Sequence, residues 1–480
     1  MSERDPAAAP SPEADVAVLP PPGDTDSPIM DREDRLRPRF VDEVLDAVHD
    51  GDVETARTLV APLHPADVAD LIELARADER DGLVAALAEL VDADVIAEMN
   101  EHVREVLVGE MAPERVAEIA AELETDDAVA IIEDLEEEEQ RAVLRAMEPD
   151  DRAAIEEALT YGEETAGRLM QRDLIAVPEH WTVGQVIDYL RSDEELANDF
   201  WEVFVVSPNH HPVGTCKLST ILRSPRRTRV SDIMAEEQTL IPVDMDQEDV
   251  ALRFQKYALV SAAVVDGSGR LVGMITVDDV VHIIQAEASE DVLLLAGAGE
   301  GDINEPLAPT IRRRLTWLVI NLGTALLAAS VVGFYQEEIA AFALLAVLMP
   351  IVSGMGGNAG TQTLAVTVRA LATNQLTSSN TVRMFGREFK IALANGLCLG
   401  VLIGAGVGLL FRNPALGAVM GTAMVINNLV AGIVGIMVPV TLERLRVDPA
   451  VSSAVFVTTA TDTMGFFSFL GLAAAVGLHA

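Results

Sequence analysis

Residues 451–478 read VSSAVFVTTATDTMGFFSFLGLAAAVGL, and Asp462 is the one charged residue among them. An apolar run of this length can cross a lipid bilayer, because a hydrocarbon core of about 30 Å needs roughly 20 helical residues. A carboxylate in the middle of such a run is costly unless it meets water or a polar partner. We therefore expect Asp462 to face an aqueous pathway or another helix.

Four further apolar runs precede this one, and together they predict an all-α membrane domain of five transmembrane helices in residues 313–480. Asp462 is the sole full charge within the five runs, whose bounds are Leu315–Phe334, Ile339–Val368, Ile391–Phe411, Ala415–Leu442 and Val451–Leu478. Basic side chains gather before the first run and after the second and fourth, Arg412 follows the third, and Glu337 and Glu338 follow the first. The positive-inside rule then predicts a multi-pass protein of the cell membrane with a cytoplasmic N-terminus and an external C-terminus.

The second run contains the glycine-rich segment MPIVSGMGGNAGTQ at residues 349–362. Pro350 and the four glycines predict a kinked or unwound helix whose freed carbonyls line a cavity. Close packing of helices on small residues is the alternative. Carbonyl oxygens together with the Asp462 carboxylate suit a hard cation such as Mg²⁺, which sheds its water reluctantly. Cobalt, nickel and calcium stay open as cargo.

The negative charge of the chain is concentrated in its first 310 residues, which carry 71 of the 77 acidic and 24 of the 34 basic side chains. Such a surface should attract cations, and it lacks the basic footprint that nucleic acids require. Cys216 and Cys398 lie in different segments without metal-ligand spacing, so neither a disulfide nor a zinc site is expected. Residues 1–38 have the composition of a disordered tail.

Residues 39–164 show short amphipathic helical patterns, with predicted starts at Pro65, Pro113, Thr125 and Pro149. Proline suits the first turn of a helix, and early acids favour the positive end of its dipole. The patterns recur about every two dozen residues, which predicts a small α-helical solenoid as an N domain.

Residues 165–284 alternate strand-like and helical runs, and their two halves repeat each other. The strand-like run 202–206 returns at 261–265, and helix 183–190 returns at 247–257. This pattern resembles a tandem pair of α/β cystathionine-β-synthase-type (CBS) domains, which often bind adenosine nucleotides. Thr276 and Asp279 match the motif that holds a ribose in such domains, whereas the first copy has Lys217 and Thr220 there. Binding of ATP is therefore left open.

Residues 285–312 are predicted to form a connector (plug) helix between the CBS domains and the membrane. The connector carries Glu287, Glu290 and Asp291 close together. A divalent ion bound among carboxylates would offset their mutual repulsion and draw the attached segments together. The alternative is that these acids merely keep the helix soluble.

This order of segments resembles the MgtE family of magnesium channels and transporters, and the resemblance covers essentially everything after the tail. It implies a homodimer with a pore between the subunits, in which Asp462 supplies a carboxylate and Gly354, Gly357 and Thr458 supply backbone carbonyls. It also implies closure of the pore by cytosolic Mg²⁺ at Glu287, Glu290, Asp291 and Asp448, with Asp279 a further candidate. His282 stands where the family commonly has an acid, and Ala454 stands where it can have an asparagine.

The sequence does not favour an enzyme. An intramembrane aspartyl protease would need a second aspartate in the spans, and a serine protease would need a base near Ser353. Two rivals to a magnesium channel are a transporter of another divalent cation and a nucleotide-regulated anion channel, since unwound helix ends can also bind anions. A third is a nucleotide-sensing scaffold with an inert membrane anchor, but that protein would not require a carboxylate at membrane depth.

Overall fold

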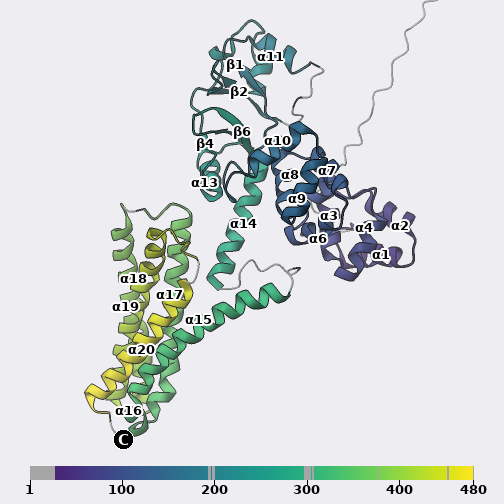
Figure 1. Ribbon diagram of the computed structural model, residues 1–480. Coiled ribbons are helices and arrows are strands. Elements are labelled where there is room, and N and C mark those ends of the chain that lie inside the picture. The colour runs from purple at the N-terminus through teal and green to yellow at the C-terminus, as the bar shows by residue number, and fades with distance from the viewer. Residues whose placement is uncertain are drawn as a thin grey trace, which may run out of the picture. The chain divides into compact units, whose positions relative to one another are not determined.

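The computed structural model describes residues 27–192, 196, 200–296, 304, 307–377, 379–450 and 453–478. The chain divides into two compact units, Met1–Val281 and His282–Ala480. The first unit contains the helical N domain and the CBS pair, and the second contains the long apolar helices (Figure 1). The boundary between the units falls within helix α14, Val277–Ala296.

The N domain is a stack of short helices around a core that includes Val44, Leu71 and Ile131, all fully buried. Helices α3, α7, α8 and α10 begin at the residues that the sequence predicts, because proline or early acids define a helix start locally. The bounds are α1 Pro38–His49, α2 Val53–Val60, α3 Pro65–Leu74, α4 Ala77–Ala86, α5 Ala93–Ala97, α6 Glu101–Gly109, α7 Pro113–Glu122, α8 Thr125–Glu133, α9 Glu137–Ala146 and α10 Pro149–Ala158.

Ordered structure begins earlier than the predicted tail boundary at residue 38. Met30 forms an antiparallel bridge with Leu36, and Leu36 is buried in the core of the N domain. The sequence prediction was wrong for this short segment because one leucine finds a place in a core that its neighbours do not reveal. Residues 1–26 of the predicted tail lie outside the described residues.

The CBS pair consists of two three-stranded sheets with the same topology, which confirms the internal repeat. In each sheet the first two strands are parallel and the last two are antiparallel, and the register shifts at equivalent positions, Val205/Val206 and Val264/Val265. The elements are β1 Ala176–Pro178, α11 Val183–Tyr189, β2 Glu202–Val206, β3 Pro212–Lys217, α12 Leu218–Arg223, η1 Val230–Asp232, β4 Leu240–Pro242, α13 Gln247–Tyr257, β5 Ser261–Val265 and β6 Leu271–Thr276.

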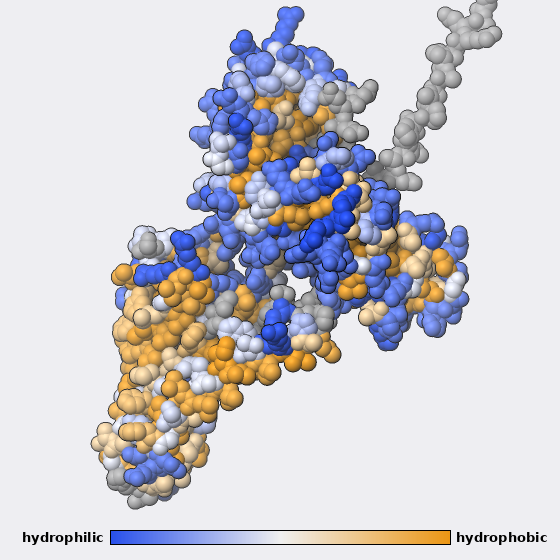
Figure 2. All heavy atoms as spheres, in the orientation of Figure 1, coloured by the Kyte–Doolittle hydropathy of each residue, from blue (hydrophilic) through white to orange (hydrophobic). Residues whose placement is uncertain are grey.

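Within the described part of the second unit, five helices are long and apolar enough to cross a membrane, as the sequence predicts. Helices α17 to α20 run side by side, and α15 leans away from them toward its own N-terminal end (Figure 1). Apolar residues cover most of the surface over these helices (Figure 2), and Leu402 is 71% exposed. Such a surface is suited to lipid contact. The bounds are α15 Leu307–Phe334, α17 Leu344–Ala372, α18 Thr381–Leu410, α19 Pro414–Arg444 and α20 Ser453–Val476.

The second span differs from its prediction at two points. Ile339 belongs to a separate short helix, α16 (Gln336–Ala341), and α17 begins only at Leu344. Helix α17 then continues through Pro350 and the glycines to Ala372, so the expected unwinding is not observed. Neighbouring helices can hold a membrane helix together across such residues, and the glycines of α17 let α19 and α20 approach it closely.

The predicted connector also has different ends. Residues 285–296 continue the last CBS helix without a break as part of α14, and residues 307–312 already belong to α15. The helical pattern of α14 carries no capping signal near residue 285 that would separate the two parts. Residues 297–303 and 305–306 of the connector lie outside the described residues.

Candidate cation pathway and regulatory acids

The central feature of the second unit is a contact between α17 and α20. Asp462 on α20 is half-buried, and the Ser353 hydroxyl on α17 donates a hydrogen bond of 2.5 Å to its Oδ1 atom. The two helices pack against each other and bring together residues 109 positions apart. The carboxylate thus has the polar partner that its place among apolar residues requires.

Asn427 on α19 lies beside this contact and was not singled out by the sequence analysis. Its side chain is 0% exposed, and its Nδ2 atom donates to the Val352 carbonyl at 2.9 Å. A Cβ atom on Gly356 of α17 would lie 2.0 Å from Asn427 Nδ2, and one on Gly465 of α20 would lie 2.8 Å from it. Asn427 therefore lies where three helices meet, and the absence of side chains at Gly356 and Gly465 leaves room for it. The available signal was a polar residue within an apolar run.

The glycines of α17 fall on two faces with different surroundings. Gly356 and Gly360 pack tightly, since a Cβ atom on Gly360 would lie 2.5 Å from Val457 of α20. Gly354 and Gly357 face open space, with nothing within 4 Å of a Cβ atom at either position. Close packing therefore explains the first pair, while the second pair leaves the backbone of α17 accessible.

The accessible face of α17 is polar in its middle turns, after the exposed apolar side chains of Val347 and Ile351. Asn358 and Thr361 follow Gly354 at helical spacing, and all three are exposed in the single chain. The Thr361 hydroxyl donates to the Gly357 carbonyl at 3.0 Å. Ser353 stands on the same row of side chains as Gly357, four residues away. The contact with Asp462 thus lies at the margin of this polar face.

Thr458 lies one helical turn before Asp462 on α20 and is also exposed. Its carbonyl accepts a hydrogen bond of 3.0 Å from the Thr461 hydroxyl. Thr458 lines a cavity of about 500 Å³ together with Ala454, Arg314, Trp317 and residues 294–296 at the end of α14. The sequence-predicted pore residues thus lie along α17 and α20, and Thr458 opens into this cavity.

The predicted regulatory acids of the second unit are partly brought together. Asp291 on α14 is half-buried. Its burial is the main cause that raises its pKa, and the negative charge of Asp448 raises it further. Asp448 Oδ1 accepts a hydrogen bond of 2.7 Å from the Ala450 amide. Glu287 is partly buried and Glu290 is exposed on the same helix. The end of α14 packs onto the bundle through Leu294 and Leu295, which contact a cluster containing Leu364, Val368, Ala450 and Val457.

In the first unit, Asp279 lies where the N domain meets the second CBS domain. The Thr276 hydroxyl donates to Asp279 Oδ2 at 2.7 Å, and Gln171 Nε2 donates to the same atom at 3.2 Å. Gln171 also donates to Glu124 at the start of α8. Burial raises the pKa of Asp279 to about 6. Burial and the negative charge of Asp279 raise the pKa of Glu124 to about 7. Burial and Asp279 raise the pKa of Asp126 as well.

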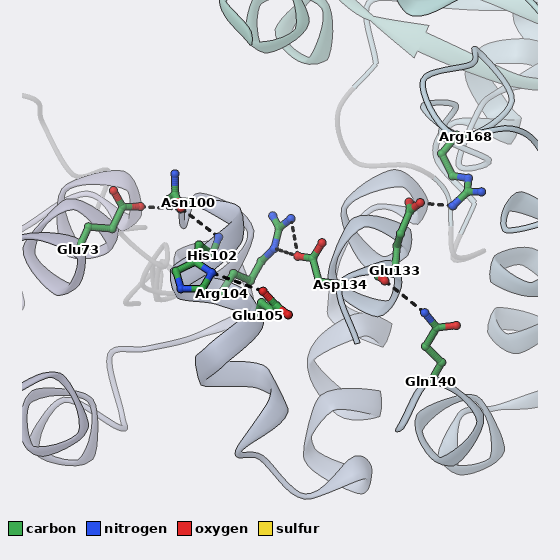
Figure 3. A network of polar contacts seen from close by, with 9 residues as sticks. All are labelled: Glu73, Asn100, His102, Arg104, Glu105, Glu133, Asp134, Gln140 and Arg168. Atoms are coloured by element: carbon green, nitrogen blue, oxygen red, sulfur yellow. Dashed lines mark hydrogen bonds and ion pairs between the residues drawn. The ribbon is translucent and has the colours of Figure 1, made fainter. Parts of the chain in front are cut away.

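Ion pairs hold α8 in this position (Figure 3). Arg104 of α6 pairs with Asp134 directly after α8 at 2.9 Å, and the two side chains are only 13% and 11% exposed. Arg168 at the start of the first CBS domain pairs with Glu133 at the end of α8 at 2.7 Å. Helix α8 therefore links the N domain to the CBS pair and presents Glu124 and Asp126 beside Asp279. The sequence does not indicate a role for these two acids, because their partner lies about 150 residues away.

Among the residues that the structure describes, no group of three or more histidine, cysteine, aspartate or glutamate side chains has the geometry to hold a metal ion. Cys216 is buried, which raises the pKa of its thiol to about 11, and Cys398 is exposed, both as free thiols.

A helical N domain, a CBS pair and five helices long and apolar enough to span a membrane, one of which carries a carboxylate, are the features of a membrane transport protein. Three family models match the chain: a divalent cation transporter domain at residues 349–472, the MgtE intracellular N domain at 63–164 and a CBS domain at 230–286. The chain belongs to the MgtE family. The family model describes a divalent cation transporter, and transporters are not a class of enzymes.

Curated relatives are described as magnesium transporter MgtE. The protein from Enterococcus faecalis is 33% identical over 66% of this chain and 70% of its own length. The Thermus thermophilus protein is 35% identical over 65% of this chain and 70% of its own length. Among solved structures, the cytosolic domain of the Mg²⁺ channel MgtE in complex with ATP is 28% identical, with a TM-score of 0.47, over 51% of this chain and 99% of that one.

Proposed function

We propose that this protein moves Mg²⁺ across the cell membrane along a pathway bordered by α17 and α20. The observation that carries the proposal is the Asp462 carboxylate, held at membrane depth by Ser353 at the margin of an exposed polar face. A polar face in the hydrocarbon region is tolerated only where it lines water or is covered by protein. The names of the curated relatives support magnesium as the cargo.

The pathway is completed by a second copy of the chain. Gly354, Asn358 and Thr361 would otherwise face lipid with polar atoms. A homodimer in which the two α17 and α20 faces oppose each other would enclose these residues and place two Asp462 carboxylates around one axis. Such a pore has oxygen atoms at its wall and suits a cation rather than an anion.

Hydrated Mg²⁺ fits this wall better than a dehydrated ion. Mg²⁺ gives up its water reluctantly and is commonly bound through one or two carboxylates with several waters retained. One carboxylate per chain, with the open backbone near Gly354, Gly357 and Thr458, offers few oxygens and no closed cage. A wider selectivity that includes Co²⁺ or Ni²⁺ is the alternative that this chemistry leaves open.

Cytosolic Mg²⁺ closes the pore in this proposal by binding at the acids of α14 and their neighbours. The Asp448 carboxylate raises the pKa of Asp291, and the repulsion between these two acids favours their separation until a divalent ion offsets it. Residues 294–296 of α14 pack on the bundle and form one wall of the cavity that Thr458 lines, so an ion that holds α14 there fixes that wall in place. This arrangement requires a cytoplasmic N-terminus and an external C-terminus.

ATP is a second proposed regulator, at Thr276 and Asp279. The Thr276 hydroxyl and the Asp279 carboxylate bond to each other, so a ribose would have to replace that bond and the one from Gln171. Calorimetric titration of the protein with ATP, compared with an Asp279→Ala variant, tests this proposal.

The decisive experiment is ion flux into liposomes that contain the purified protein. We expect uptake of Mg²⁺ with little chloride movement, and loss of divalent flux in Asp462→Ala, with little recovered in Asp462→Asn. Glu337→Gln, at an exposed acid of α16, is the matched control and should transport normally. Undiminished Mg²⁺ uptake by a well-folded Asp462→Ala protein would sink the proposal, and preferential chloride flux would favour the anion channel.

A further inference from the structure

The Ser353 hydroxyl bonds to a different helix, in contrast to the hydroxyls of Ser330 and Ser468. Such side chains commonly bond back to the carbonyl of their own helix. Ser330 does so to Leu327, and Ser468 does so to Gly465 at 3.1 Å. The Ser353 hydroxyl instead crosses from α17 to the Asp462 carboxylate on α20. Its bond therefore acts on the orientation of the Asp462 carboxylate.

The structure also fixes the turn of α17 that carries Ser353. The adjacent Val352 carbonyl accepts from Asn427 of α19, and Val352 itself is fully buried. Gly356 lies against the same asparagine one turn later. These contacts fix the position of Ser353 along α17. A residue that orients a functional side chain must itself be held in place in this way.

A carboxylate whose Oδ1 accepts from a fixed donor presents its other oxygen, Oδ2, to an approaching ion. One oxygen can accept hydrogen bonds from the waters of a hydrated Mg²⁺. Ca²⁺ loses water more readily and takes carboxylates with one or both oxygens in a flexible shell of 6–8 ligands. Tying down Oδ1 therefore disfavours the two-oxygen contact that Ca²⁺ can use.

We propose that Ser353 is a positioning residue that orients Asp462 for contact with hydrated Mg²⁺ and thereby sets the preference for Mg²⁺ over Ca²⁺. The inference rests on the proposed role of Asp462 in the pathway. It assigns to Ser353 an effect on ion preference, which is separate from an effect on whether the protein transports at all.

The test compares Ser353→Ala with wild type in liposomes, with Mg²⁺ and Ca²⁺ uptake measured on the same preparations. We expect Ca²⁺ uptake relative to Mg²⁺ to rise roughly tenfold, the order of effect of one hydrogen bond to a charged group. Ser353→Thr keeps the hydroxyl and should restore the wild-type ratio. Ser353→Cys, a weaker donor of similar size, should fall between the two and serves if the alanine variant folds poorly.

Ser468→Ala is the matched control, because it removes a buried hydroxyl from α20 that bonds only within its own helix in the described structure. An equal ion ratio in Ser353→Ala, Ser468→Ala and wild type overturns the inference. If Asp462→Ala abolishes flux in that same series, the proposed function stands and only the role of Ser353 is lost. If Asp462→Ala transports normally, the proposed function itself fails.

Discussion

A Cβ atom on Gly356 would lie 2.0 Å from the Nδ2 atom of Asn427, so the glycine on α17 and the asparagine on α19 fit only as a pair. Gly356→Ala should therefore destabilise the bundle by about 1–3 kcal/mol, the usual cost of overpacking. Gly354→Ala, two residues away in open space, should leave stability unchanged. Thermal unfolding in detergent compares the two, and equal midpoints would show that the asparagine moves aside easily.

The open glycines lead to a prediction on transport rather than stability. Gly357→Val places a branched side chain on the accessible face of α17 and should reduce Mg²⁺ flux several-fold while the protein still folds. Gly333→Val on α15 is the control, because Gly333 is also helical and also has nothing within 4 Å of a Cβ atom. Similar flux in both variants would mean that this face of α17 does not border the pathway.

The acids of α14 predict a change in gating. Replacing Glu287 and Glu290 with glutamine and Asp291 with asparagine removes ligands and repulsion together. Loss of ligands should leave the pore open at millimolar Mg²⁺, whereas loss of repulsion would make it close more readily. We expect the first result, because the bridging ion is what stabilises the closed form.

Flux against cytosolic Mg²⁺ concentration measures this gating, with protease protection of α14 as a second readout. Asp448→Asn should shift the Mg²⁺ dependence in the same direction, because Asp448 is the acid that faces Asp291. If the triple variant keeps the wild-type dependence on Mg²⁺ in both flux and protease protection, these acids only keep the helix soluble and do not gate the pore.

The acids between the N domain and the CBS pair predict a pH dependence. Folding raises the pKa of Glu124 to about 7 and that of Asp279 to about 6, so the folded form binds protons that the unfolded chain releases. The associated stability is present below the unfolded pKa of about 4 and is lost as pH rises through about 6 to 7. Without divalent ions, this junction should therefore open more readily at pH 8 than at pH 5.

Asp279 is also a candidate ligand of regulatory Mg²⁺, so Mg²⁺ should oppose this opening more strongly at pH 8 than at pH 5, because protons and metal compete for that carboxylate. Hydrogen exchange at α8 measures the opening. The double variant Glu124→Gln, Asp279→Asn should flatten both the pH and the Mg²⁺ dependence. A pH profile that the double variant leaves unaltered would place the titrating groups elsewhere.

The ion pair between Arg104 and Asp134 predicts a large effect on the N domain, since both side chains are mostly buried (Figure 3). Arg104→Met leaves a buried carboxylate without its partner, which typically costs about 3–5 kcal/mol. Arg141→Met removes an exposed pair with Glu137 and should cost less than about 1 kcal/mol. Chemical denaturation followed by circular dichroism compares the two, and equal losses would contradict the role of burial.

The sequence by itself determined the elements whose signals are local. Five apolar runs became five membrane helices because the bilayer requires a continuous stretch of apolar residues. Helices begin at Pro65, Pro113 and Pro149 because proline acts on its own turn. The two CBS copies were visible because a repeat can be read along the chain. The importance of Asp462 followed from its charge in an apolar run.

Tertiary structure decided which of these elements touch. The sequence does not indicate that Ser353 meets Asp462, that Asn427 fills the place left by Gly356, or that Gly356 and Gly360 pack while Gly354 and Gly357 stay open. The sequence also predicted an unwinding of α17 that the structure does not have, since neighbouring helices, and not the local residues, hold that helix together at Pro350. Contacts between distant segments depend on how helices rotate and cross, and a one-dimensional apolar pattern leaves both of these free.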